Sequence, residues 1–298
     1  MGMALSQERL AEHVTELLRR TATSLPADVR QALAGAAPSE EKDSAAQTTL
    51  MLLLENVNLA KDCSTPVCQD TGSIFMYVDY SPREWSQKVL TEAVHRAAAE
   101  ATAKSYLRPN AVDPLTGKNS GNNIGVGAPY VHFEERDGPG LRFRLLLKGG
   151  GSENVSRQYS LPDSRLGAGR DIDGIRRCVI DAVFAAQGEG CAPGIIGVGI
   201  GGPDRAASML LAKEQLFRTL DDVNPRKDLA ELEKRLFWEL NTLSIGPMGF
   251  GGRTTVLGVK MGAQHRHPAS FFVSIAYLCW AARRCSMTVS ADGGVSYD

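Results

Sequence analysis

The sequence has almost no net charge and no long hydrophobic run. Its 298 residues include 33 Lys and Arg against 34 Asp and Glu, for a net charge of -1, so the surface supplies no overall field that would attract nucleic acid or acidic lipid. The longest apolar run near the N-terminus is 50–54, far shorter than the ~20 residues of a membrane span, and no basic signal-type segment precedes it. We therefore expect a cytoplasmic protein that binds neither nucleic acid nor membrane.

Repeats, low-complexity tracts and Cys-x-x-Cys pairs are also missing. Without Cys-x-x-Cys, a zinc ribbon and a thioredoxin-type redox pair are disfavoured. The chain does contain 43% apolar residues, 30 glycines and 6 cysteines. This apolar content is enough for a full core and excludes disorder. In a reducing compartment the cysteines are thiols, metal ligands or catalysts rather than disulfides.

Hydrophobic periodicity predicts a mixed α+β fold with a β-sheet core region surrounded by many helices. We expect a helical N-terminal part, about 5–105, and a sheet-containing part, about 110–290, with no composition break that forces a split. Between 269 and 290 the strand and helix patterns compete. The expected helices are 6–20, 40–60, 82–105, 174–187, 204–219 and 229–243, and the expected strands are 130–133, 141–147 and 194–200.

Two glycine-rich runs invite a ligand-binding interpretation. Gly197–Gly202 satisfies G-x-G-x-x-G after an apolar strand, and Asp221 lies near the downstream position that a dinucleotide fold needs. The chain after Asp221 does not continue as a second buried strand, which disfavours nucleotide binding. The other run, 148–154, also follows a strand. Glycines at both places allow the backbone to approach a ligand closely, and tight turns explain them equally well.

The local sequence around each cysteine separates those beside turns from those within apolar runs. Cys68 is attached to a polar, turn-forming run, 69–72, and Cys191 stands just ahead of the apolar strand and its glycine turn. Cys178 lies in a helical pattern among apolar residues, and Cys279 lies in an apolar run. On local context alone, the last two are core cysteines.

Several motifs occur in a fixed order along the chain: Cys68-Gln69-Asp70-Thr71-Gly72, Leu107-Arg108-Pro109-Asn110-Ala111-Val112, Lys148–Asn154, Gly197–Gly202, Ile245–Gly252 and His267-Pro268-Ala269-Ser270. Together they resemble the class I, iron-sulfur fumarate hydratases over about residues 5–285. The match is to the N-terminal half of that family, which is the alpha subunit where the enzyme is made as two chains. Tartrate dehydratase alpha chains share the scaffold, and the run 246–255, with its segment 250–255, looks like the fumarase version.

The resemblance implies a four-iron four-sulfur cluster held by three cysteines, with one iron left open for substrate. The family's ligands fall on Cys68, Cys191 and Cys279, so the resemblance replaces the core interpretation of Cys279. The other cysteines match no ligand position. They are Cys63, Cys178 and Cys285.

The family's substrate contacts fall on Gln69, Asp70, Arg108, Gly151 and His267. The open iron is expected to act as a Lewis acid on the hydroxyl and one carboxylate of the substrate, and Arg108 offers a planar fork that suits a carboxylate. Asp70 is expected to exchange a proton with the hydroxyl, with His267 tuning its charge. Gln69 and the backbone at Gly151 would supply neutral hydrogen bonds.

The resemblance makes 1–298 a single catalytic domain, the alpha domain of an iron-sulfur hydro-lyase that hydrates fumarate reversibly to (S)-malate in the tricarboxylic acid cycle. The family's other carboxylate clamp and its carbon base reside in the C-terminal half, so we expect a beta subunit, a hetero-oligomer and little activity of this chain alone. One alternative is a dehydratase of tartrate or another 2-hydroxy dicarboxylate. Another is a non-catalytic, cluster-bearing subunit in which Arg108 and Asp70 are dispensable.

Overall fold

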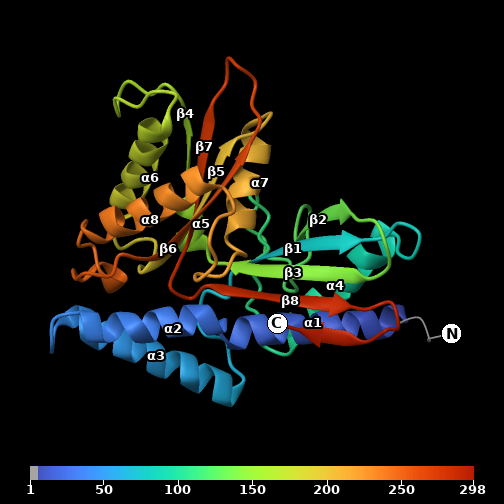
Figure 1. Ribbon diagram of the computed structural model, residues 1–298. Helices are drawn as coiled ribbons and strands as arrows, with labels where there is room; N and C mark the ends of the chain where they lie inside the picture. Colours follow the sequence, from blue (N-terminus) through green and yellow to red (C-terminus); the bar gives the residue numbers. More distant parts are fainter. Residues whose placement is uncertain (1–5) are drawn as a thin grey trace. The chain divides into compact units, whose positions relative to one another are not determined.

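The computed structural model describes residues 6–298 and contains two compact units (Figure 1). The first unit comprises the described residues up to Pro26, Asn56–Gly149 and Arg283–Asp298, and the second comprises Ala27–Glu55 and Gly150–Ala282. Each unit combines one sheet with helices, which confirms the expected α+β class. Residue 5, where the helical part was expected to begin, lies outside the described residues.

The first unit is built on a five-stranded sheet in the order β2-β1-β3-β8-β9. β2 pairs in parallel with β1, and the remaining pairs are antiparallel. Helices α1 and α4 pack with this sheet around one apolar core, to which Leu17, Leu90 and Phe143 contribute. The elements are α1 (Gln7–Thr23), β1 (Ser73–Tyr80), α4 (Gln87–Ala103), β2 (Tyr130–Glu135), β3 (Leu141–Lys148), β8 (Arg283–Val289) and β9 (Val295–Tyr297).

The second unit is built on a four-stranded sheet in the order β4-β7-β5-β6. Its elements are α2 (Ala27–Ala36), η1 (Ala37–Ser39), α5 (Gly150–Asn154), β4 (Arg157–Ser160), α6 (Ile172–Ala186), β5 (Gly194–Gly201), α7 (Arg205–Gln215), α8 (Lys227–Asn241), η2 (Pro247–Gly249), β6 (Val256–Gln264) and β7 (Phe272–Leu278). Helix α3 (Ala45–Cys63) begins in this unit's sequence and ends in that of the first.

The central strand β5 shows why one glycine-rich run exists. Its branched residues Ile196 and Val198 belong to the core that contains α6 and α8. The glycines that alternate with them face α7, because a Cβ at Gly197 would overlap the carbonyl oxygen of Ala212, and one at Gly199 would overlap that of Ser208. These glycines are therefore explained by the close packing of a helix on a strand.

The expected helices and strands correspond to elements of the structure within a few residues at each end. The ambiguous segment 269–290 forms the strands β7 and β8. A strand, β1, lies within the range expected to be helical, because its sequence SIFMYVDY is rich in branched and aromatic residues that pack well in a sheet. Strand β6 was also missed, since Gly258 and Gly262 interrupt its apolar pattern.

Candidate active site

Cys191 lies in a tight loop between α6 and β5, in the second unit. Its φ is +54°, a left-handed conformation that few residues other than glycine adopt. The loop is fixed on both sides of the cysteine, since the N–H of Cys191 donates to the carbonyl oxygen of Gly188 at 3.0 Å, and that of Met248 donates to the carbonyl oxygen of Ala192 at 2.8 Å. The glycine-rich segment around Met248 therefore holds the backbone that presents the Cys191 thiol.

Cys279 adjoins this loop, so two of the predicted cluster ligands come together. The N–H of Trp280 donates to the carbonyl oxygen of Cys191 at 3.1 Å. Tyr277, on β7, packs against the same loop, because a Cβ at Gly190 would lie 2.7 Å from its ring. Burial raises the pKa of Tyr277, and the nearby Cys279 and Cys191 act in the same direction. Cys279 is 8% exposed, and the residue that follows it, Trp280, is hydrogen-bonded to Cys191.

His267 lies in the exposed turn between β6 and β7, which two arginines hold. Arg266 donates to the carbonyl oxygens of His267, Pro268 and Ser270, and Arg170 donates to that of Ala269 at 2.8 Å. The N–H of Ala269 donates to Nδ1 of His267 at 3.1 Å. With Nδ1 accepting, the neutral imidazole carries its proton on Nε2, which is the tautomer that can donate to another group.

Gly151 lies in the short helix α5, at the start of the second unit's sheet region. It is exposed, and a Cβ there would lie 3.5 Å from the carbonyl oxygen of Glu189 in the Cys191 loop. The backbone at Gly151 therefore lies close to the loop that carries Cys191, within the same unit.

Cys68, Gln69 and Asp70 form one segment of the first unit, between α3 and β1. Val67, the residue before Cys68, is held by two hydrogen bonds. Its N–H donates to the carbonyl oxygen of Ala22 at 2.9 Å, and its carbonyl oxygen accepts from Nδ2 of Asn56 at 2.8 Å. Oδ1 of Asp70 accepts from the N–H of Gly72 at 3.0 Å. The carboxylate of Asp70 is thus oriented by its own turn.

Arg108 lies beside this segment, in the same unit. Its N–H donates to Oγ1 of Thr71 at 3.0 Å, and its guanidinium donates to the carbonyl oxygen of Gln69 at 3.4 Å. Arg108 is exposed, and no carboxylate within residues 6–298 forms an ion pair with it. A guanidinium in this situation is available for a carboxylate from outside the chain.

The cysteines that match no ligand position are held as protonated thiols or lie at a surface. Burial raises the pKa of Cys178 to about 12, and Asp163 and Asp181 act in the same direction. Burial also raises the pKa of Cys285 to about 11, and its Sγ donates to the carbonyl oxygen of Asp298. Cys63 is exposed at the end of α3. Because metals bind the thiolate, the raised pKa disfavours Cys178 and Cys285 as ligands.

The predicted site residues divide between the two units. Cys68, Gln69, Asp70 and Arg108 belong to the first, and Cys191, Cys279, Gly151 and His267 belong to the second. Among the residues that the structure describes, no group of three or more His, Cys, Asp or Glu side chains gathers as a metal site. Cys191 and Cys279 carry thiols, the soft donors that iron-sulfur clusters require, and their backbone segments are hydrogen-bonded within one unit.

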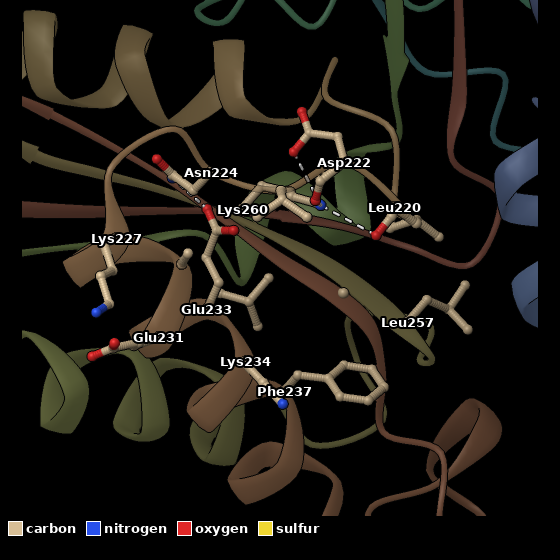
Figure 2. Close-up of a pocket in the computed structure, with 14 residues that line it drawn as sticks. Leu220, Asp222, Asn224, Lys227, Glu231, Glu233, Lys234, Phe237, Leu257 and Lys260 are labelled. Atoms are coloured by element: carbon tan, nitrogen blue, oxygen red, sulfur yellow. Dashed lines mark hydrogen bonds and ion pairs between the residues drawn. The ribbon is translucent and has the colours of Figure 1, made fainter.

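A cavity of about 550 Å³ lies between α8 and β6 and contains none of the predicted site residues (Figure 2). Lys260 is buried there, and its Nζ donates to the carbonyl oxygens of Leu220 at 3.1 Å and Asp222 at 2.7 Å. Burial lowers the pKa of Lys260. Glu233 accepts from Arg218 at 2.7 Å. These buried charges therefore fix the segment 220–224 rather than form the candidate site.

Sequence reasoning missed the side chains that support the site. Glu40 accepts from the N–H groups of Arg253 and Thr254 at 2.8 Å each, which gives the fumarase-like run 250–255 a structural role. Tyr277 was not singled out, although it lies against the Cys191 loop. Thr71 and Asn110 lie inside the quoted motifs but were given no role. Their contacts are long-range, so no local sequence signal could have identified them.

A sequence model of the family described as fumarate hydratase (fumerase) matches residues 11–288. A protein of Geobacillus stearothermophilus named "Putative fumarate hydratase class I" is 49% identical over 290 residues, which are 96% of this chain and 56% of that protein. The "Putative L(+)-tartrate dehydratase subunit alpha" of Methanocaldococcus jannaschii is 34% identical, over 95% of this chain and 99% of that subunit. The "L(+)-tartrate dehydratase subunit alpha" of Escherichia coli (strain K12) is 31% identical, over 95% and 92%. The chain thus spans about half the length of the first relative and nearly all of the other two.

No helix among residues 6–298 is both long enough and apolar enough to span a membrane.

Proposed function

The chain belongs to the fumarate hydratase family, and we propose that it is the alpha part of an iron-sulfur hydro-lyase that interconverts fumarate and (S)-malate. The observation that carries this proposal is the meeting of Cys191 and Cys279 at one loop. Local sequence gives no reason for two cysteines 88 positions apart to adjoin, whereas a shared cluster does. The higher identity to the fumarate hydratase relative, 49% against 34% and 31%, favours fumarate.

Cys68, Cys191 and Cys279 would hold the cluster, a four-iron four-sulfur group with three protein ligands and one open iron. When bound, this group supplies a Lewis acid for a substrate oxygen. The left-handed backbone at Cys191 supports this role, because strained conformations persist where a side chain must be presented in one direction. A reducing compartment such as the cytoplasm keeps these residues as free thiols, which lose their protons when they bind the metal.

Arg108 binds one carboxylate of the substrate through its guanidinium. In hydration Asp70 takes a proton from the attacking water, and in dehydration it returns that proton to the departing hydroxyl oxygen. His267 donates a hydrogen bond from Nε2 and stabilises the negative charge of the Asp70 carboxylate or of the substrate. The hydrogen bond from Ala269 to Nδ1 supports this assignment, since it leaves Nε2 as the donor. Gln69 and the backbone at Gly151 supply neutral hydrogen bonds to the same substrate.

The other carboxylate clamp and the base for the carbon-bound proton would come from a beta subunit in a hetero-oligomer. The two tartrate dehydratase relatives are named as alpha subunits, and the chain matches nearly their whole length. These names support a partner chain.

The same match supports a second candidate substrate, L(+)-tartrate. Tartrate differs from malate by one hydroxyl, so the same carboxylate clamp and the same elimination of water would serve both. The non-catalytic alternative predicts instead that Arg108 and Asp70 are dispensable.

The direct test is a substrate panel with the anaerobically purified chain, alone and co-produced with a beta-type partner. We expect hydration of fumarate to (S)-malate with the partner and nearly none without it. Faster dehydration of L(+)-tartrate would move the assignment to tartrate. Full activity of a colourless, iron-free protein would contradict the proposal, and so would a normal rate from the chain alone.

A further inference from the structure

We propose that Thr71, Asn110 and Asn123 form a bracket that positions Arg108 for the substrate carboxylate. The bracket means these three side chains, all in the first unit. The inference rests on the proposed function, in which Arg108 binds that carboxylate, and it assigns positioning roles to residues outside the proposed ligands and substrate contacts.

Thr71 joins the Asp70 segment to the Arg108 segment through one hydroxyl. Its side chain is almost completely buried, at 1% exposure. Oγ1 accepts from the N–H of Arg108 and from Nδ2 of Asn110, both at 3.0 Å. Nδ2 of Asn110 also donates to the carbonyl oxygen of Gly72 at 3.1 Å. The backbone that carries Asp70 and the backbone that carries Arg108 are thus tied together at two points.

Asn123 fixes the same segment from the other side. It is 6% exposed and has a φ of +62°, a conformation that Asn tolerates better than most residues. Its Oδ1 accepts from the N–H of Asn110 at 2.7 Å, and its Nδ2 donates to the carbonyl oxygen of Arg108 at 2.9 Å. Nδ2 also donates to Oγ1 of Thr102 on α4 at 2.8 Å, which anchors the bracket to a helix.

The backbone of Arg108 is therefore held at both of its polar groups by side chains, and Pro109 restricts its conformation further. Its guanidinium, by contrast, is exposed and donates a long hydrogen bond, 3.4 Å, to the carbonyl oxygen of Gln69. A fixed backbone beneath an available charged group is the arrangement that orients a ligand before it binds. Packing alone does not explain why the buried side chains of Thr71 and Asn123 form hydrogen bonds with the backbone of the exposed residue Arg108.

The experiment is a double-mutant cycle between Thr71 and Arg108 in the cluster-loaded enzyme with its beta-type partner. Thr71→Val keeps the shape and removes the acceptor. We expect it to raise the KM for the dicarboxylate about 10-fold with kcat within about threefold, because a carboxylate clamp binds substrate and transition state alike. Thr71→Ser, which keeps the hydroxyl, should restore most of the loss. In an Arg108→Ala background, Thr71→Val should raise KM less than twofold.

The matched control is Asn122→Ala in the same loop, since Asn122 is exposed and its Oδ1 accepts from Ile124. This variant should keep the wild-type KM. If Thr71→Val does not fold, Asn123→Asp replaces it in the cycle, because it keeps the size and loses both donor bonds. Hydrogen exchange at the Arg108 amide, measured without substrate, should accelerate in Thr71→Val.

The bracket is overturned if Thr71→Val lowers only the melting temperature and leaves KM unchanged, or if its effect on KM is undiminished in the Arg108→Ala background. If Arg108→Ala itself leaves KM unchanged, the role of Arg108 in the proposed function fails. In that case the hydrogen-exchange result decides whether the bracket holds the Arg108 backbone.

Discussion

The two units hold their candidate site residues by different means. In the first unit, side-chain hydrogen bonds orient both segments: the Asp70 carboxylate accepts from the N–H of Gly72, and the Thr71 hydroxyl accepts from Arg108 and Asn110. In the second, Cys191 is oriented by backbone, through a left-handed φ and glycines that admit Tyr277. The first unit holds the proposed substrate-binding arginine, and the second holds two of the proposed cluster ligands.

The difference follows from what each group must do. A guanidinium or carboxylate that binds substrate is best oriented through hydrogen bonds that fix its backbone and leave the charged group available. A thiolate ligand needs a fixed direction and close approach of the backbone to a bulky cluster, which glycine allows and side chains would obstruct. Substitutions around Asp70 and Arg108 should therefore affect substrate binding and turnover, and substitutions around Cys191 should affect cluster retention.

The largest effect is expected from the cysteines. Cys191→Ser or Cys279→Ser should lose the cluster and at least 10³-fold in activity, because both residues are proposed ligands. The matched control is Cys178→Ser in the same unit, whose buried thiol is held protonated, and it should keep its iron. Iron and sulfide content after anaerobic reconstitution checks this. Equal cluster loss in all three variants would contradict the assignment of Cys191 and Cys279 as ligands and of Cys178 as a core residue.

Gly149→Ala tests the position of the Asp70 carboxylate in the first unit. A Cβ there would lie 2.8 Å from Oδ2 of Asp70, so the carboxylate must move while the fold need not. A misplacement of about 1 Å can cost on the order of 10²-fold in rate. We expect kcat to fall by about that factor with the iron content unchanged. An unchanged kcat would contradict the assignment of Asp70 to proton transfer.

Gly190→Ala tests the packing beside Cys191. The new Cβ would lie 2.7 Å from the buried ring of Tyr277, and overpacking of this kind costs about 1–3 kcal/mol. We expect the melting temperature to fall by roughly 5 °C and cluster retention to weaken. Gly35→Ala in α2 is the control, since a Cβ there meets nothing within 4 Å and should stabilise the helix by about 0.5–1 kcal/mol. Equal melting temperatures for the two variants would count against this account of the loop.

The smallest effect concerns a surface ion pair of the first unit. Hydrogen bonds from Arg19, and then from Arg20, lower the pKa of Glu16 from 4.5 to about 2. Since the folded pKa is depressed, the stabilisation is present above about pH 4.5 and is lost as the pH falls toward 2. These side chains are partly exposed, so Glu16→Gln should cost no more than about 1 kcal/mol at pH 7. Melting curves at pH 7 and pH 3.5 should show a smaller difference from wild type at the lower pH.

The sequence predicted the elements with strong periodicity, such as α1 and β5, because burial of one face determines both pattern and structure. It could not predict the division into two units, since each unit is assembled from segments distant in the chain. The candidate residues came from motifs, and the adjacency of Cys191 and Cys279 agrees with them. Thr71 and Asn123 were missed because their roles depend on contacts with Arg108 across 37 and 15 positions.

The central claim is that this chain, with a beta-type partner, carries a cluster whose open iron meets a dicarboxylate. Mössbauer spectra of the ⁵⁷Fe-reconstituted enzyme, recorded with and without (S)-malate, test it most directly. We predict four irons per chain, of which one changes its spectrum when malate is added. Substitution of Cys68, Cys191 or Cys279 by Ser should abolish the signal. A protein without iron, or a cluster in which no iron responds to malate, would contradict the account.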